Sequence, residues 1–414
     1  MSSSKFSIVI PTRNRAGLLR HALATAVGQT HDDVEILVSD NCSSDETSGV
    51  VAASDDPRIR YVRSDVPLTN AESWEFAVSH ATGEWITVLG DDDGFVSSLV
   101  DRVLPVLDRD APDLLVWNPA WYVHPDTDPP WPVVAERNVL SIHPFGGATT
   151  EVDARDQLRR MFQRREADPL PSVVNGFARR ALLERVRAKA GRVFGEPDPS
   201  WAFAAAAMVC VDKYLVLDLP LTVAGVSPVN IGGAFLRNTR EHAVIEEFDQ
   251  SALFRHAPLQ VRTCVNLVAE SLLRQKEVLG DDLVEFELDL VRYLVGNRVE
   301  LTDAARASDG GAALDEWRRV LRCQPPAVRA NVRRDLLRHR VRSVARAVGA
   351  RVPGGRAVRA AMRRDVSAFR LVAGSDHGFS DLPGATDYLA RWVLPVGTQE
   401  FVRASPTASR RGGG

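Results

Sequence analysis

Cysteine is scarce in this sequence of 414 residues. The four cysteines are widely separated and form no CxxC pair: Cys42, Cys210, Cys264 and Cys323. Disulfide frameworks and structural zinc sites need several cysteines at close, regular spacings. The sequence therefore argues against both, and we expect the cysteines to be small buried apolar residues.

Long apolar runs are also missing. A helix that spans a bilayer needs about 20 apolar residues, and the Ala-rich segment 203–211 is far shorter. Residues 1–5 lead into a short apolar run that stops at Pro11, without the longer apolar region and cleavage site of a signal peptide. These absences predict a cytoplasmic protein.

The overall composition is that of a globular protein, with 45% hydrophobic and 25% charged residues. A formal net charge of −3 conceals an asymmetry, because arginines gather in the last third of the chain. Lysine is nearly absent, which indicates a general preference for arginine and weakens what each arginine says about function.

The first half of the sequence alternates short β-branched or apolar runs with segments of helical period. Residues 7–10, 34–38, 59–62 and 85–89 are predicted strands separated by predicted helices, and 114–117 is a further strand. This alternation is typical of βαβ units on a parallel sheet, so the expected fold class is α/β. The Pro- and Gly-rich segment 124–150 is expected to be a long irregular excursion.

Strand signals fade after Val223, and the remainder is predicted to be helices separated by Gly and Pro turns. Because a domain commonly has about 100–200 residues, we expect two of them. The first is an α/β domain over 1–245, and the second is a mainly helical domain over 246–400. Residues 401–414 are expected to be a disordered tail.

Unusual polar residues follow three of the predicted strands, in segments 11–15, 39–41 and 90–94. Ligands of open α/β sheets bind at the carboxyl ends of strands. The third segment contains Asp91, Asp92 and Asp93, here called the acidic triplet. Three adjacent carboxylates repel one another unless a cation such as Mg²⁺ or Mn²⁺ offsets their charge, and such an ion also binds phosphates. A turn with solvated carboxylates is the alternative.

With these segments in order, the sequence resembles the family 2 glycosyltransferases, the inverting enzymes of the GT-A fold. The resemblance covers about residues 6–226 and rests on segments 7–15, 38–47, 81–93 and 195–198. It implies a GT-A (Rossmann-like) nucleotide-diphospho-sugar transferase domain. Such a domain moves a sugar from a nucleotide-sugar donor, expected to be UDP- or dTDP-linked, to a hydroxyl acceptor.

The resemblance also implies roles for single residues. Donor contacts are expected from six of them: Pro11, Thr12, Arg13, Asp40, Asn70 and Asp91. Asp40 would accept the N3 hydrogen of a uracil or thymine ring, or alternatively cap the turn after its strand. Asp92 is the implied ligand of Mg²⁺ or Mn²⁺, and Asp93 is implied as a second metal ligand or as structural support. The ion would stabilise the charge on the departing nucleoside diphosphate.

Single displacement with inversion needs one general base beside the acceptor. The resemblance implies Asp198, which precedes the Ala-rich helix, whose N-terminus favours a charged carboxylate. Two alternatives stay open. Asp198 could simply be the N-cap of that helix, and Glu196 could be the base, since Pro197 separates two acids that stand together in the commoner family pattern.

A histidine that many relatives carry after the last strand is missing from 221–227. The nearest candidate is His242, which we expect to be a solvated surface residue.

Residues 317–365 contain about fifteen arginines against two aspartates, around an apolar stripe of helical spacing at Leu337, Val341, Val344 and Val348. Basic amphipathic helices bind anionic membrane surfaces, which here would be the inner face and would suit a lipid-linked acceptor. The alternative is a solvated helix that packs on the catalytic domain or on a second subunit of a homodimer. Nucleic acid is not expected, because a recognised fold and interleaved aromatics are absent.

Two other functions remain as alternatives. A non-catalytic adaptor could keep the GT-A fold and use the basic helices to bind a membrane or a partner. A sugar nucleotidyltransferase would need a Gly-rich loop after the first strand, and residues 11–15 contain no glycine. The sequence leaves the acceptor open among glycan, lipid-linked, natural-product and peptide hydroxyls.

Overall fold

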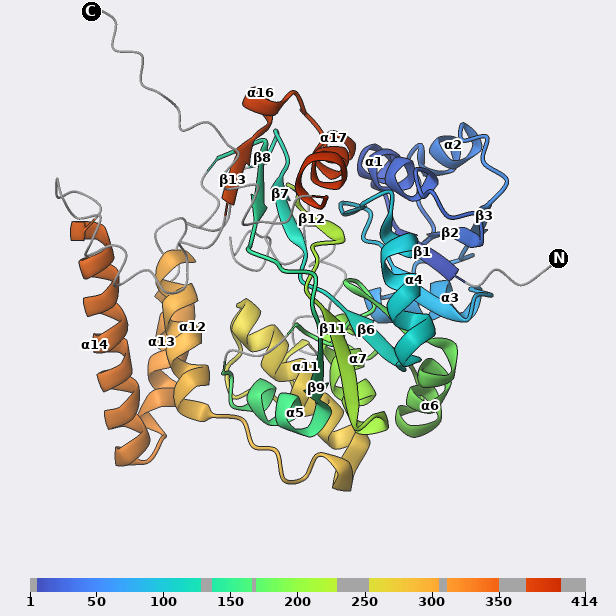
Figure 1. Ribbon diagram of the computed structural model, residues 1–414. Coiled ribbons are helices and arrows are strands. Elements are labelled where there is room, and N and C mark those ends of the chain that lie inside the picture. Colours follow the sequence, from blue (N-terminus) through green and yellow to red (C-terminus); the bar gives the residue numbers. More distant parts are fainter. Residues whose placement is uncertain are drawn as a thin grey trace, which may run out of the picture.

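The structure of this protein is a computed structural model (Figure 1). It describes residues 6–127, 136–165, 169–228, 253–304, 311–349 and 370–395, apart from the side chains of 303–304 and 342–349. The predicted tail and His242 lie outside these ranges.

The strands, in chain order, are β1 Phe6–Thr12, β2 Val34–Asp40, β3 Ile59–Arg63, β4 Trp85–Val88, β5 Gly94–Phe95, β6 Leu114–Val116, β7 Ala120–Val123, β8 Val139–Ile142, β9 Thr149–Asp153, β10 Gly176–Arg179, β11 Lys213–Leu217, β12 Thr222–Val226 and β13 Arg370–Ala373. The helices are α1 Ala16–Val27, α2 Thr47–Ala52, α3 Asn70–Ser79, α4 Leu99–Asp110, α5 Ala154–Phe162, α6 Arg180–Ala190, α7 Pro199–Cys210, α11 Cys264–Leu279, η1 Gly280–Asp282, α12 Leu290–Ala304, α13 Gly311–Arg322, α14 Pro326–Gly349, α16 Gly374–His377, α17 Leu382–Tyr388 and η2 Leu389–Val393.

The larger sheet has eight strands in the order β3-β2-β1-β4-β10-β6-β11-β9. Strands β1 to β4 are mutually parallel, and β6 and β11 run in the same direction, because β10 is antiparallel to both β4 and β6. Their ends define one side of the sheet, here called the carboxyl edge. The predicted α/β class and the strands expected at 7–10, 34–38, 59–62, 85–89 and 114–117 are confirmed.

Both faces of this sheet are covered, as expected for strands that are apolar on both sides. Along β1, Ile8 and Ile10 belong to a cluster with α1 and α4, whereas Val9 belongs to a cluster with α3, α6 and α7. The alternation of β1 therefore places helices on opposite faces and leaves the carboxyl edge free for polar residues.

A second, five-stranded sheet has the order β13-β8-β7-β12-β5. Strand β8 pairs with β7 and lies within the segment that the sequence predicted to be an irregular excursion. That prediction is wrong at 139–142, and also at 149–150, where β9 begins. The prolines and glycines around this four-residue run conceal it, and β8 is stabilised by pairing with distant strands rather than by a local pattern.

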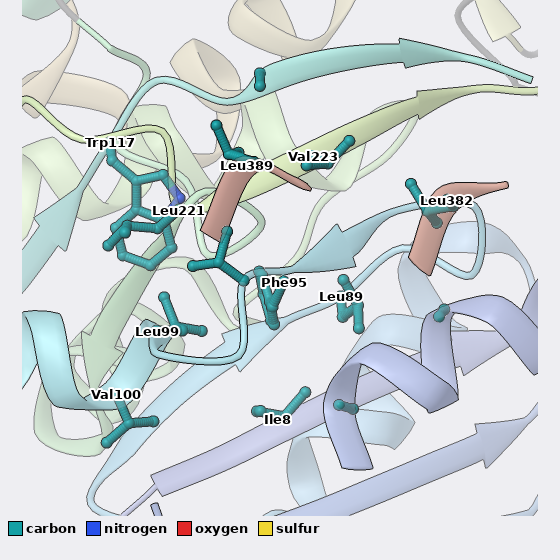
Figure 2. Close-up of a cluster of buried hydrophobic side chains, with 14 of the residues drawn as sticks. Ile8, Leu89, Phe95, Leu99, Val100, Trp117, Leu221, Val223, Leu382 and Leu389 are labelled. Atoms are coloured by element: carbon teal, nitrogen blue, oxygen red, sulfur yellow. The ribbon is translucent and has the colours of Figure 1, made fainter. Parts of the chain in front are cut away.

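The C-terminal residues 370–395, here called the strap, return to the first half of the chain. Strand β13 pairs with β8, and α17 lies beside α1 (Figure 1). Figure 2 shows Leu382 and Leu389 in the same apolar cluster as Phe95 and Leu221. The strap thus closes the core directly behind β5, the strand that follows the acidic triplet.

The rest of the C-terminal region is helical, as predicted. Helix α11 packs on α7, and Leu272 joins the core that contains Phe203. Helices α12 to α14 form a separate cluster around Tyr293 and Trp317. The predicted boundary at residue 245 lies outside the described residues, so the two-domain division stays a prediction.

Two further properties of the described residues bear on the sequence predictions. Their helices include none with the length and apolar character needed to cross a bilayer. All four cysteines are free thiols, of which three are partly buried, while Cys323 is exposed. The expectation of burial is therefore wrong for Cys323, which lies in the turn after α13.

Candidate functional site at the carboxyl edge

The acidic triplet follows β4 in a tight turn, in which the Asp93 amide donates to the Gly90 carbonyl at 3.0 Å. Asp91 is 5% exposed and Asp92 is 7% exposed. The alternative of a turn with solvated carboxylates is therefore wrong for these two residues.

Asp91 connects the ends of β4 and β1. Its Oδ2 accepts a hydrogen bond from Thr12 Oγ1 at 2.9 Å, and its Oδ1 accepts one from Arg15 Nη1, also at 2.9 Å. Burial raises the pKa of Asp91 although the Arg15 charge acts in the opposite direction, and the Asp91 charge raises the pKa of Arg15. The structure brings these residues together, as their positions after two neighbouring strands predict.

Asp92 and Asp93 are held from the other side by the end of β12. Ser227 Oγ donates to Asp92 Oδ2 at 2.8 Å, and the Gly225 amide donates to Asp93 Oδ1 at 2.8 Å. Burial, followed by the charge of Asp92, raises the pKa of Asp93 well above its usual value. Two separate strands therefore fix the triplet.

Gly225 cannot carry a side chain in this arrangement. A Cβ atom at this position would lie 1.7 Å from the Asp92 carbonyl oxygen and 2.9 Å from His124 Nε2. The main chain of the triplet occupies the space that any other residue would fill, so glycine is required here for close approach rather than for a positive φ.

His124 is a site residue that sequence reasoning missed. It follows β7, is 5% exposed, and its Nε2 lies 3.4 Å from the Asp92 carbonyl oxygen. Burial lowers the pKa of His124, against the nearby charge of Asp92. The family pattern places a histidine shortly after the last strand, and at that place this chain has Ser227. A polar residue directly after a strand was the available signal.

The donor set of the triplet fits a divalent cation. Burial and the neighbouring charge of Asp92 raise the pKa values of Asp91 and Asp93, and Arg15 forms an ion pair with Asp91. Among the described residues, no three or more His, Cys, Asp or Glu side chains are grouped so that they could hold a metal ion by themselves. A Mg²⁺ or Mn²⁺ ion would therefore take carboxylate oxygens from the protein and the remaining oxygens from a bound diphosphate.

Asp40, at the end of β2, is fully buried and already hydrogen-bonded. Its Oδ1 accepts the Ser43 amide at 2.8 Å, which is the turn-capping role foreseen as an alternative. Its Oδ2 accepts Tyr61 Oη at 2.6 Å and Arg63 Nη1 at 3.0 Å. A nucleobase would have to displace one of these donors, so the predicted contact with the base stays a prediction.

The other predicted donor-binding residues also lie at the carboxyl edge. Pro11 and Arg13 stand at the end of β1 and are partly buried. Asn70 is the first residue of α3, whose N-cap Thr69 forms a capping box with Glu72. The structure gathers these residues on one side of the sheet, and their contacts with a donor stay predictions.

Asp198 is the N-cap of α7. Its Oδ1 accepts the amides of Ser200 at 2.9 Å and Trp201 at 3.2 Å, and Pro199 occupies the first helical position. Because α7 leads into β11, which is parallel to β1, its N-terminus lies at the carboxyl edge. Burial raises the pKa of Asp198, and the two amides oppose this shift. The capping alternative is confirmed, whereas the role as base stays a prediction.

Glu196 has a less satisfied carboxylate than Asp198. Its Oε1 accepts Thr69 Oγ1 at 2.6 Å, which joins the starts of α3 and α7. Its Oε2 is buried and has no hydrogen-bond partner among the described residues, and burial raises the pKa of Glu196. A buried oxygen without a partner is costly and commonly marks a site for a ligand or an ordered water.

The N-terminal region is similar to known proteins. Residues 7–186 match the family model "Glycosyl transferase family 2". A GalNAc(5)-diNAcBac-PP-undecaprenol beta-1,3-glucosyltransferase of Campylobacter jejuni is 36% identical over 106 residues, which are 24% of this chain and 33% of that protein. The match thus spans about a third of the relative's length.

Two solved structures are more distantly similar. S. aureus TarS 1–349 in complex with UDP-GlcNAc is 15% identical with a TM-score of 0.45, over 72% of this chain and 81% of that one. A Pyrobaculum calidifontis mannosyltransferase in complex with GDP-Man and Mn²⁺ is 17% identical with a TM-score of 0.40, over 82% and 87%. The family match and the mixed sheet together confirm the predicted GT-A-like α/β fold.

Proposed function

From the match of residues 7–186 to the family model "Glycosyl transferase family 2", we propose that the chain transfers a sugar from a nucleotide-sugar donor to a hydroxyl acceptor with inversion. The observation that carries the proposal is the buried acidic triplet at the carboxyl edge, held by Thr12 and Arg15 on one side and by Gly225 and Ser227 on the other. The cost of burying two carboxylates and partly burying a third supports a functional rather than a structural reason for keeping them.

The donor is proposed to be UDP- or dTDP-linked. Its base and ribose would lie against Pro11, Thr12 and Arg13, near Asp40, while Asn70 and Asp91 would contact the ribose or the sugar. A role for Asp40 requires that Tyr61 or Arg63 give up its hydrogen bond to Oδ2 when the base binds. Because Tyr61 and Arg63 are 37% and 43% exposed, both can move without disturbing the core.

Asp92 and Asp93 would hold Mg²⁺ or Mn²⁺, which supplies charge stabilisation for the nucleoside diphosphate as it leaves. Each oxygen of Asp91 already accepts one hydrogen bond, from Thr12 or from Arg15, and its remaining lone pairs are left for a ribose or sugar hydroxyl. Arg15 stays close enough to contribute positive charge to the same region.

Asp198 is proposed as the general base. The acceptor oxygen attacks the anomeric carbon, the bond from that carbon to the diphosphate breaks, and the acceptor proton passes to the carboxylate. Among the described residues, only Oδ1 of Asp198 accepts hydrogen bonds, so Oδ2 can receive the proton. Glu196 is the competing candidate because its Oε2 is buried and unpartnered.

The acceptor is proposed to be a hydroxyl of a growing glycan or glycoconjugate. The name of the Campylobacter jejuni relative describes action on a glycan carried by undecaprenol diphosphate. The acceptor class rests on this likeness of a quarter of the chain, whereas the donor side rests on residues at the carboxyl edge.

The test is turnover of sugar nucleotides by the purified full-length chain. UDP-, dTDP- and GDP-linked sugars are incubated with Mn²⁺, with Mg²⁺ or with EDTA, and release of the nucleoside diphosphate is measured. We expect turnover of one uridine or thymidine donor, loss of it with EDTA, and loss of it in Asp92→Asn. A chain that neither turns over any donor nor gains thermal stability with donor and metal would support the adaptor alternative and overturn the proposal.

A further inference from the structure

Helix α14 has two separate apolar faces. On the inner face, Val332 is fully buried, and Val328 and Leu336 pack against the cluster around Tyr293 and Trp317. This face accounts for the attachment of α14 to α12 and α13. A helix that lies on the surface of a small bundle needs one such face.

On the outer face, Leu337 is 62% exposed and Val341 is 59% exposed. They are one helical turn apart and therefore adjacent on the helix surface. Three arginines stand within about one turn of this pair on the same side: Arg333, Arg334 and Arg340. Arg334 is paired with Asp335, whereas Arg333 and Arg340 form no ion pair with any residue that the structure describes.

We propose that this outer face of α14 binds the surface of an anionic lipid membrane. The two aliphatic side chains would enter the headgroup boundary, while the arginines extend around them to lipid phosphates. The helix contains seven arginines and one aspartate, so its charge is complementary to an anionic surface over its whole length: Arg329, Arg333, Arg334, Arg338, Arg340, Arg342 and Arg346, with Asp335.

The same charges argue against a second copy of this chain as the occupant. A two-fold contact through this face would bring the identical faces of two helices together. Arg333 and Arg340 of each copy would then meet like charges with little acid nearby. A lipid surface provides the opposite charge and an apolar layer at once.

Two other exposed aliphatic residues provide a matched comparison. Val278 at the end of α11 is 52% exposed, and Val284 after η1 is 61% exposed. Their neighbours are mostly acidic, because Glu277, Asp281, Asp282, Glu285 and Glu287 surround them in the sequence. An anionic membrane would repel that surface, so equal exposure there should give no binding.

This inference does not rest on the proposed sugar transfer. It concerns a helix outside the family match, and its test measures binding without activity. A chain that binds vesicles but turns over no donor would overturn the proposed function alone. A chain that turns over a donor but does not bind vesicles would overturn this inference alone.

The test is co-sedimentation of the full-length chain with vesicles of phosphatidylcholine, alone or mixed with phosphatidylglycerol. We expect binding to the mixed vesicles, little binding to phosphatidylcholine alone, and weaker binding as salt is raised. Arg333→Gln combined with Arg340→Gln should weaken binding roughly 25-fold, at about fivefold for each arginine. Leu337→Ser combined with Val341→Ser should weaken it about tenfold, because two aliphatic side chains no longer insert.

The controls separate this surface from general stickiness. Val278→Ser combined with Val284→Ser removes equally exposed aliphatic groups and should leave binding unchanged, as should Arg318→Gln, whose arginine is paired with Asp315. All of these side chains are exposed, so each variant should fold, which circular dichroism would verify. The inference is overturned if the wild-type chain does not bind mixed vesicles, if the control variants bind as weakly as the test variants, or if Leu337→Ser and Val341→Ser abolish self-association rather than vesicle binding.

Discussion

Replacing Gly225 by alanine should displace the acidic triplet, although the substitution changes none of its three aspartates. The new Cβ would lie 1.7 Å from the Asp92 carbonyl oxygen, whereas real Cβ atoms essentially never approach closer than 3.0 Å. The carbonyl would have to retreat by about 1.3 Å. Because the obstructing atom is main chain, no side-chain rotation relieves the contact, and the hydrogen bonds from Gly225 to Asp93 and from Ser227 to Asp92 are put at risk.

The magnitude follows from these losses. Overpacking a tight site costs roughly 1–3 kcal/mol, and each lost hydrogen bond to a charged group costs roughly 1.5–3 kcal/mol. We expect Gly225→Ala to lower the free energy of unfolding by about 3–5 kcal/mol, less than the full sum because the loop relaxes in part. A displacement of about 1 Å can cost roughly 100-fold in rate, so turnover should fall at least that much in protein that still folds.

The assay is urea unfolding together with donor turnover in Mn²⁺. Gly17→Ala is the matched control, since a Cβ at Gly17 would meet nothing within 4 Å, and this helical position should tolerate alanine or be stabilised by it. Calorimetric titration with Mn²⁺ and donor would show whether the variant's metal site is lost. Equal stability and equal activity of Gly225→Ala and Gly17→Ala would show that the triplet does not need glycine at position 225.

Three further predictions concern the base, the charge of the triplet and the strap. Asp198→Asn should keep the cap of α7, because asparagine caps well, and should lower kcat by roughly 100- to 10,000-fold. If Glu196→Gln lowers kcat more than Asp198→Asn at equal stability, Glu196 is the base instead. Burial raises the pKa values of Asp91 and Asp93 above the unfolded value of 3.8, so the folded state holds these two protons to higher pH than the unfolded state does. Metal-free protein should therefore lose stability as pH rises from about 4 through the raised pKa values. Added Mn²⁺ should therefore raise Tm more at pH 8 than at pH 4, which thermal melts in EDTA and in Mn²⁺ would check. Asp93→Asn should reduce this difference in the Mn²⁺ effect between the two pH values. Equal effects of Mn²⁺ on Tm at both pH values would contradict a metal site at the triplet. Leu382→Ala should lower the free energy of unfolding in urea by about 2–5 kcal/mol, because Leu382 is fully buried. Trp392→Ala in the same strap should leave it nearly unchanged, because Trp392 is 64% exposed. Similar effects of the two substitutions would show that the strap does not complete the core.

The elements that the sequence predicts well are those whose signal is local. Most of the predicted strands of the larger sheet are short runs of four or five mostly apolar or β-branched residues, and the helices between them carry a 3.6-residue period. The triplet is readable for the same reason, because a strand ends visibly at Leu89 and three carboxylates follow it. From the order of strands, residues 12 and 91 could be expected at one edge, and their side chains are in hydrogen-bond contact.

The parts that escape prediction are held by partners far away in the sequence. Strands β5, β8 and β13 have two to four residues and no period of their own, and each forms because a distant strand presents free main-chain groups. Gly225, Ser227 and His124 acquire their importance only from contact with the triplet, 32 to 135 residues away. His124 has one local signal, its position directly after a strand, and that signal alone does not connect it with the triplet.

The contacts around β5 also show why the family-matched residues 7–186 are not enough to make the site. The triplet needs Gly225 and Ser227 from β12, and the proposed bases Glu196 and Asp198 lie beyond the match. Directly after the triplet, Gly94 is tightly enclosed, because Thr386 and Leu382 of the strap lie 3.0 Å and 3.3 Å from the position of its missing Cβ. The C-terminal strap thus supports the strand that anchors the triplet. A shortened chain that lacks residues 317–414 would lose both this support and helix α14. Membrane binding must therefore be tested by point substitutions in the full chain, where loss of membrane binding can be distinguished from loss of the acidic triplet.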